Sequence, residues 1–447
     1  MNKKLTHAEY VFVGSMLFGM LFGAGNLIFP VHMGQLAGSH FWGANFGFIS
    51  TGVFMPFLAL IAFGLSGSAS LEELAGNVHP VFSKIFTVLL YLTIGPAFAL
   101  PRTATVSYQI GIAPFVDGEQ PLLLAAFTFV FMAVGLLFSL KPSKLIVYIG
   151  KGLNPIFLVF LAILMAAALV SPMGSIGSAL PQGDYVTHAF LTGFKEGYNT
   201  MDVLAMLAFS VVVIDTLKNL GIQDTSNITK DLLKVGVIVV LLMALLYTLI
   251  TWLGTSSVGQ LPVSANGGIA LAQITHAYFG SVGGVLLAAI VTFACLKTAI
   301  GLITACSNTF VELFPGTLGY KAYCVAFAGV SFLIGNVGLT QIIVLAVPIL
   351  MLLYPMAITL ILSSFACALF GRDRRLYRWP MLLAGIAAFG DMLSVLPKGV
   401  QGLGIIQSLL GLYRQLPLFN LGMSWLLPTL AALVAAVAVV KFSGQRA

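Results

Sequence analysis

The chain has 447 residues, of which 59% are apolar and only 8% are charged. Soluble domains carry about 25% charged residues, so this composition excludes a water-soluble globular protein and indicates an integral membrane protein. The sequence has no Walker A loop, no His, Cys or carboxylate cluster with metal-ligand spacing, and no nucleophile–base pattern typical of an enzyme. It therefore predicts no resident cofactor and no nucleic-acid partner. The net charge of +7 is distributed over the segments between apolar runs.

Apolar segments of helical length follow one another along the whole chain. A helix of about 20 apolar residues spans a bilayer, whereas barrel strands would alternate over about 10 residues, which no segment does. The predicted fold class is an all-α membrane protein with about twelve transmembrane helices in one domain. The expected spans are 9–33, 43–65, 82–111, 121–139, 145–170, 190–216, 233–257, 278–313, 321–338, 340–369, 379–396 and 422–441.

Basic residues indicate the orientation of these spans. Lys and Arg accumulate in cytoplasmic loops, and with a cytoplasmic N-terminus most of the 21 basic residues fall on that side. Lys141, Lys144 and the cluster Arg372–Arg378 are examples. We therefore expect a multi-pass protein of the plasma membrane (the bacterial inner membrane), with both termini in the cytoplasm.

The first span contains the stretch "GMLFGAGNLIFP", residues 19–30. Non-helical backbone at membrane depth is tolerated only where it is buried in protein or lines a cavity. Close helix packing is the alternative explanation, because Ser15, Gly19 and Gly23 form a stripe of small residues. Packing does not require Asn26 followed by Pro30, so a functional break in the helix is favoured.

A second polar interruption, "KEGYNTMD", occupies residues 195–202 in the sixth span. The sixth span is five steps after the first, an odd number, so it enters the membrane from the side opposite to the first. Paired broken helices in halves of opposite topology indicate the substrate site of a secondary transporter.

Several motifs along the chain resemble the BrnQ family of branched-chain amino acid:cation symporters. The similarity covers essentially the whole chain and implies a transporter of leucine, isoleucine and valine driven by a sodium or proton gradient. It also implies a LeuT-type arrangement, with inverted repeats over residues 9–170 and 190–369 and extra helices over 379–441. The motifs are "FGAGNLIFP" (22–30), "GPAFALPRTATVSYQIGIAP" (95–114), "GYNTMDVL" (197–204), "SANGG" (264–268) and "ACLKTAIGLITAC" (294–306).

An amino acid zwitterion needs donors for its carboxylate and acceptors for its ammonium, and a broken helix supplies both. The half-helix that starts after a break presents free N–H groups, and the one that ends before it presents free carbonyls. We therefore expect the half-helix beginning near Asn26 to bind the carboxylate and the carbonyls of both breaks to face the ammonium. The predicted substrate-binding residues are Phe22, Gly23, Ala24, Gly25 and Asn26 in the first span and Tyr198, Asn199, Thr200, Met201 and Asp202 in the sixth.

Asp202 and Arg102 are charged residues inside predicted spans, where an ionisable group is by default a functional hypothesis. Asp202 is either a functional carboxylate or a structural counter-ion for Arg102, and the sequence does not favour one over the other. For Arg102, a structural or gating role is favoured over direct contact with the substrate carboxylate.

In the eighth span, Thr298 lies on a stripe with Ala294, Gly301 and Asn308 that we expect to face the bundle. The resemblance implies a sodium ion between the carbonyls of Gly19 and Phe22 and the Thr298 hydroxyl. The chain departs from the family by placing Lys297 where a threonine or small residue is usual. An ammonium about 4 Å from sodium costs about 4 kcal/mol at an effective dielectric of 20.

Gln109 also replaces a glutamate that is usual in the family, and both changes make the site more positive. We expect the Lys297 ammonium to replace the sodium ion, so that coupling is to protons or exchange. The alternative is that Lys297 reaches another carboxylate, such as Asp391. A channel or sensor of the same fold, gated by amino acid, remains the alternative function.

Overall fold

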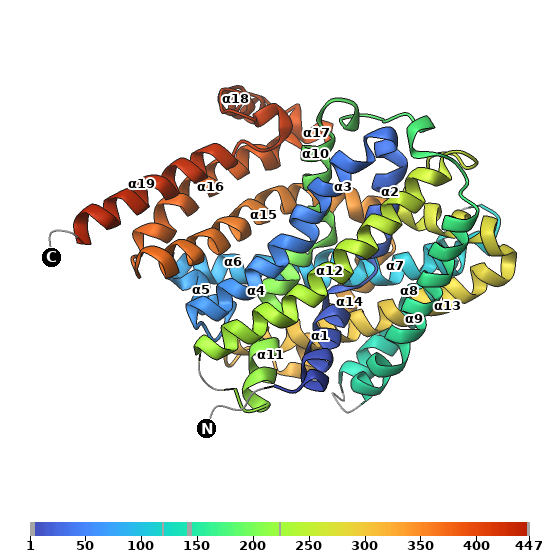
Figure 1. The fold of residues 1–447 in the computed structure, drawn as a ribbon, viewed down its shortest axis with the longest axis horizontal. Coiled ribbons are helices and arrows are strands. Elements are labelled where there is room, and N and C mark those ends of the chain that lie inside the picture. Colours follow the sequence, from blue (N-terminus) through green and yellow to red (C-terminus); the bar gives the residue numbers. More distant parts are fainter. Residues whose placement is uncertain (1–4, 119, 141–144, 223–224, 445–447) are drawn as a thin grey trace.

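The structure is a computed structural model that describes residues 5–118, 120–140, 145–222 and 225–444. Lys141 and Lys144, which the sequence assigns to the cytoplasmic side, lie outside these residues. Throughout the described part of the chain the secondary structure is helical and contains no strand. Figure 1 shows one bundle of long helices.

Each predicted span coincides with a helix or a pair of helices. The first span is α1 followed by α2, the second is α3 with α4, the third is α6 with α7, and the sixth is α10 with α11. By length and composition, six stretches of the described residues can cross a membrane, or seven when the bent pair 185–219 is included. The main helices are α1 (His7–Leu21), α2 (Gly25–Ala37), α3 (Phe41–Ile49), α4 (Met55–Ser66), α6 (Pro80–Leu92), α7 (Ala99–Gly111), α8 (Pro121–Ser139), α9 (Leu145–Val170), α10 (Tyr185–Glu196), α11 (Asp202–Asn219), α12 (Thr225–Ser257), α13 (Gly267–Leu313), α14 (Tyr320–Gly335), α15 (Leu339–Phe370), α16 (Arg375–Ser394) and α19 (Leu426–Gly444).

Short helices complete the connections. They are α5 (Leu71–Gly76), α17 (Lys398–Gln401), α18 (Gly404–Tyr413) and the 3-10 turns Gly38–His40, Ala113–Phe115, Ile176–Ser178, Gly197–Thr200 and Phe419–Leu421, with π-helical turns at Ser50–Phe54 and Thr93–Ala97. The second π-turn holds Gly95 in a non-helical conformation next to Pro96. A proline inside a helix removes one hydrogen bond of the ladder, which explains the kink in the third span.

The helix α13 begins eleven residues before the predicted start of the eighth span at residue 278. The Asn266 side chain caps it by accepting hydrogen bonds from the N–H groups of Gly268 and Ile269. The helix then bends at Gly280, whose φ of 59° is in the left-handed region that glycine adopts without steric cost. The first part of α13 contains Gln273, Thr275 and His276, which lower its hydropathy, so the sequence pattern placed the start of the span too late.

Two pairs of helices approach each other closely at glycines. On α2 and α12, a Cβ on Gly34 would lie 2.0 Å from the Thr251 carbonyl oxygen, and one on Gly254 would lie 1.9 Å from the Val31 carbonyl oxygen. On α3 and α10, Gly47 and Gly193 stand in the same relation to backbone carbonyls of the opposing helix. Small residues at such contacts let helix backbones pack closely, and these two contacts hold the α2 half of the first broken span and the α10 half of the sixth.

The last helices form a hairpin on one side of the bundle. Figure 1 shows α19 beside α16, which in turn lies beside α15. Asp391 of α16 is buried and accepts the Ser424 N–H at 3.0 Å, which fixes the chain just before α19. The carboxylate proposed as an alternative partner of Lys297 is therefore bound within this C-terminal hairpin.

Candidate functional site

The first span is broken at Phe22–Ala24, as the sequence predicts. The helix α1 ends at Leu21, Phe22 has extended backbone dihedrals, and α2 begins at Gly25, one residue earlier than expected. The Asn26 side chain bridges the gap by accepting a hydrogen bond from the Gly23 N–H at 2.7 Å. The N–H groups of Leu27 and Ile28 donate to the Ala24 carbonyl, so the N–H groups that this end of α2 presents to the break are those of Gly25 and Asn26.

The sixth span is broken at Gly197–Met201, and its two halves meet at 46°. Met201 has φ 62° and ψ 16°, a left-handed conformation that is uncommon for a residue other than glycine. The Thr200 hydroxyl accepts the Asp202 N–H at 3.4 Å and donates to the Gly197 carbonyl. Strained backbone of this kind persists only where the surroundings hold it, and it concentrates at functional sites.

The two breaks are joined by a buried polar cluster. The Asn26 amide donates to both Asp202 carboxylate oxygens, at 3.0 and 2.8 Å, and also contacts the Tyr247 hydroxyl. Tyr247 of α12 donates its own hydroxyl to Asp202 at 2.7 Å. The Asp202 side chain is 1% exposed, and a buried carboxylate is stable only when it is hydrogen-bonded. The cluster therefore fixes the register of one break against the other.

Arg102 on α7 lies on the other side of the same region. Its Nη1 donates to the Asn199 carbonyl in the second break at 2.6 Å, and its guanidinium lies 5.0 Å from the ring centroid of Phe29. Among the described residues no salt bridge joins Arg102 to a carboxylate. Asp202 therefore makes no direct ion pair with Arg102, although the two charges interact at longer range.

The bulky predicted substrate-binding residues Phe22, Tyr198 and Met201 are brought together only in part. Phe22 is buried and stacks on Phe18, and Met201 is buried at the second break. The Tyr198 ring instead stacks on Tyr354 of α15, with 4.3 Å between the ring centroids. All three residues thus lie at the breaks, but the Tyr198 ring packs toward α15.

The eighth span contacts the first break through Thr298. A Cβ on Gly23 would lie 3.4 Å from the Thr298 hydroxyl oxygen, and this hydroxyl donates to the Ala294 carbonyl at 3.1 Å. The expected bundle-facing stripe is only partly buried, since Asn308 is exposed and a Cβ on Gly301 would meet nothing. The Thr298 face of α13 therefore packs against the first break, and it becomes more exposed toward the C-terminal end of the helix.

Lys297 is half-buried on α13, and Gly19 is half-buried on α1, three residues before Phe22. Gln109 lies about two helical turns from Arg102 on α7, where its side chain is 3.1 Å from a Cβ built on Gly268. Gln109 thus contacts the N-terminal end of α13.

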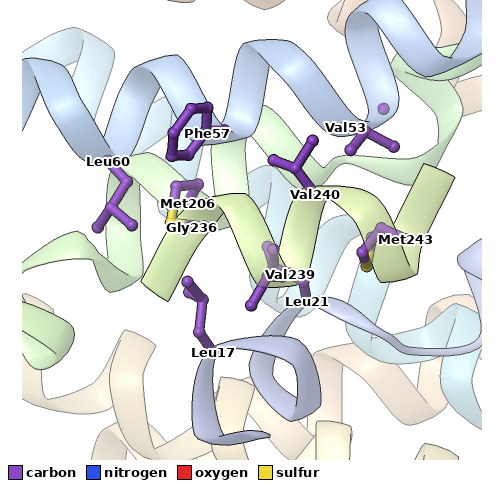
Figure 2. Close-up of a pocket in the computed structure, with 11 residues that line it drawn as sticks. Leu17, Leu21, Val53, Phe57, Leu60, Met206, Gly236, Val239, Val240 and Met243 are labelled. Atoms are coloured by element: carbon purple, nitrogen blue, oxygen red, sulfur yellow. The ribbon is translucent and has the colours of Figure 1, made fainter. Parts of the chain in front are cut away.

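A polar cavity of about 480 Å³ lies beside the second break and has Tyr198 and Asn199 in its wall. Lys195, Glu196 and Arg414 also line it, together with residues of α15. Figure 2 shows a second space, an apolar crevice between α1, α4, α11 and α12 that includes Leu21, Met206 and Met243. Its volume of about 10 Å³ suffices for about one water molecule, so this crevice is too small for an amino acid.

Two members of the site were missed by sequence reasoning. Tyr247 and Tyr354 are fully buried beside the breaks, yet each occurs as a single tyrosine within an apolar run. The only signal was a hydroxyl in a segment otherwise made of aliphatic residues, and a buried Tyr hydroxyl usually needs a partner.

Two helices broken side by side and joined through their breaks are the arrangement of the LeuT-like fold. Solved structures of this fold match nearly the whole chain at low sequence identity. The inward-facing Mhp1 structure has a TM-score of 0.59 and 14% identity, covering 97% of this chain and 90% of Mhp1. MhsT in complex with L-phenylalanine has a TM-score of 0.53 and 14% identity, covering 99% of each chain.

The sequence comparison is more specific. The family model described as "Branched-chain amino acid transport protein" matches residues 6–443, and the chain belongs to this family. The branched-chain amino acid permease BrnQ of Lactobacillus delbrueckii subsp. lactis is 42% identical, covering 99% of this chain and 98% of the relative. BrnQ of Bacillus subtilis is also 42% identical, covering 96% of each chain, and BrnQ of Escherichia coli is 34% identical, covering 100% and 99%.

Proposed function

We propose that this chain imports leucine, isoleucine and valine across the plasma membrane as a cation-coupled secondary transporter, with both termini in the cytoplasm. The observation that carries the proposal is the hydrogen-bonded contact between the two broken helices, through Asn26 and Asp202, in a member of this family. The permease names of its relatives support the substrate class. A pocket distinguishes one methylene by only about 1–3 kcal/mol, so all three substrates are accepted.

The substrate lies between the breaks in this proposal. The N–H groups at the start of α2 bind the carboxylate, because they carry the positive end of the helix dipole. Carbonyls of Gly23 and Ala24, with those near Tyr198 and Thr200, accept from the ammonium. Gly25 allows the backbone to approach the ligand. Support comes from the interrupted helix ends at each break.

The domain arrangement consists of inverted repeats over residues 9–170 and 190–369, followed by the C-terminal hairpin. Support comes from the helix packing, because inverted repeats make α2 equivalent to α11 and the α3–α4 span equivalent to α12. The corresponding pairs α2–α12 and α11–α4 are both in contact. Such equivalence is expected if the halves share one ancestral packing.

The coupling site lies where α1, the first break and α13 meet. Its ligands are the carbonyls of Gly19 and Phe22 and the hydroxyl of Thr298, and support comes from the close approach of Gly23 to Thr298. The ammonium of Lys297 takes the position of the sodium ion in relatives. Transport then requires no sodium and follows the proton gradient or operates by exchange, since a desolvated lysine readily exchanges its proton.

Labelled leucine uptake into proteoliposomes tests the function, with sodium and proton gradients imposed separately. Uptake with the proton gradient alone, or leucine exchange with neither gradient, supports the proposal. Strict sodium dependence refutes the role of Lys297 but is consistent with a branched-chain amino acid transporter. Counterflow separates a carrier from a channel or sensor, because only a carrier accumulates external label against preloaded leucine.

A further inference from the structure

The Arg102 guanidinium occupies the space between the two breaks. Its Nη1 donates to the Asn199 carbonyl at 2.6 Å, and its Nη2 lies 2.9 Å from the position that a Cβ on Gly25 would take. The side chain is 5% exposed. One end of the guanidinium thus holds the second break, and the other end faces the start of α2 at the first break.

The charge of Arg102 is not balanced by a protein carboxylate in direct contact among the residues that the structure describes. Asp202 is the anionic residue of the site, and its oxygens accept hydrogen bonds from Asn26 and Tyr247. Guanidinium carries five N–H donors, and a buried charge is costly unless it is paired and hydrogen-bonded. An anion bound at the Nη2 edge would complete this arrangement.

We propose that Arg102 binds the α-carboxylate of the substrate directly, together with the N–H groups at the start of α2. The inference rests on the proposed function and makes Arg102 a specificity residue for that same site. Guanidinium binds carboxylates in a bidentate fork, and Gly25 leaves room because a side chain there would meet Nη2. The transporter therefore selects molecules with a free carboxylate beside the amino group.

A structural role for Arg102 makes a different prediction. Its bond to Asn199 would then only hold the second break in place, and its loss would weaken the binding of every ligand by a similar factor. Direct recognition instead affects only ligands that carry the carboxylate. The comparison of leucine with leucinamide, in which an uncharged amide replaces the carboxylate, separates the two roles.

The experiment measures ligand-induced thermal stabilisation of the purified full-length protein, which reports the ratio of ligand concentration to Kd. In the parent, leucine binds at least about a hundredfold more tightly than leucinamide, the range expected for a buried charge pair. Arg102→Gln lowers leucine affinity by about a hundredfold and leaves leucinamide affinity within about threefold. Thr105→Val is the matched control on the same helix, because its hydroxyl bonds only to backbone of α7, and it retains the parent preference.

Equal weakening of leucine and leucinamide by Arg102→Gln overturns the inference, as does a parent that binds the two equally. If Arg102→Gln does not accumulate, Arg102→Lys provides the test. That variant keeps the positive charge but cannot form two parallel hydrogen bonds to the carboxylate. Its preference for leucine over leucinamide is therefore retained but about tenfold smaller than in the parent. Loss of both affinities in equal measure again overturns the inference. A parent that neither binds nor transports leucine refutes the proposed function itself.

Discussion

Replacing Tyr247 with phenylalanine tests whether the buried cluster joins the two breaks energetically. The change removes one hydroxyl, which donates to Asp202 at 2.7 Å and contacts the Asn26 amide, and it leaves the ring in place. A hydrogen bond to a charged group contributes about 1.5–3 kcal/mol. We therefore expect the free energy of unfolding to fall by about 1.5–3 kcal/mol, and the leucine KM to rise.

Unfolding in mixed SDS micelles measures the loss of stability, and leucine uptake in proteoliposomes measures the change in KM. Tyr91→Phe is the matched control. The Tyr91 hydroxyl is also buried, but it donates to an uncharged backbone carbonyl, that of Ala208, at 3.3 Å. A bond between neutral groups contributes about 0.5–1.5 kcal/mol, so this control loses less stability than Tyr247→Phe and keeps the parent KM.

A double-mutant cycle with Asp202→Asn isolates the contribution of the carboxylate charge. In the Asp202→Asn background, the cost of Tyr247→Phe falls to about 1 kcal/mol, because the remaining bond joins neutral groups. Identical losses in both backgrounds would show that the carboxylate charge does not stabilise the cluster. A loss in the parent background no larger than that of Tyr91→Phe would equally refute the reasoning.

Other substitutions test the close approaches and the coupling site. Gly25→Val places a branched side chain against Arg102, which a Cβ already meets at 2.9 Å. Leucine uptake is therefore abolished, while immunoblots show a normal amount of the variant in the membrane. Normal uptake contradicts the backbone-approach argument. Gly254→Ala puts a methyl group 1.9 Å from a carbonyl oxygen of α2 and lowers the unfolding temperature. The control Gly329→Ala on α14, where a Cβ meets nothing, leaves the unfolding temperature unchanged. Equal unfolding temperatures for the two variants argue against the tight α2–α12 contact. Lys297→Thr makes leucine uptake sodium-dependent, and Lys297→Met impairs coupling without creating sodium dependence. Uptake in choline buffer, with and without an inward proton gradient, measures both effects. Strict sodium dependence of the parent rules out the replacement of sodium by the Lys297 ammonium.

The sequence by itself determined the class of protein and the position of both breaks. Long apolar segments leave few alternatives to spanning helices, because the bilayer core cannot satisfy free backbone groups. A break within such a segment is therefore conspicuous, and the residue types at 22–26 and 197–202 are enough to locate the two breaks along the chain. Local chemistry carries this information, since the residues that interrupt a helix are adjacent in the chain.

The tertiary structure alone decided which side chains meet across the breaks. Asn26 and Asp202 are 176 residues apart, and Arg102 reaches Asn199 across 97 residues. The sequence left open whether Asp202 pairs with Arg102, and the packing of α12 assigned that carboxylate to Asn26 and Tyr247 instead. Hydropathy predicts that a helix lies inside the bundle, but not how this helix is rotated about its axis relative to the other helices. Rotation is set by close contacts such as Gly34 against α12, and these depend on surfaces that meet only in the folded protein.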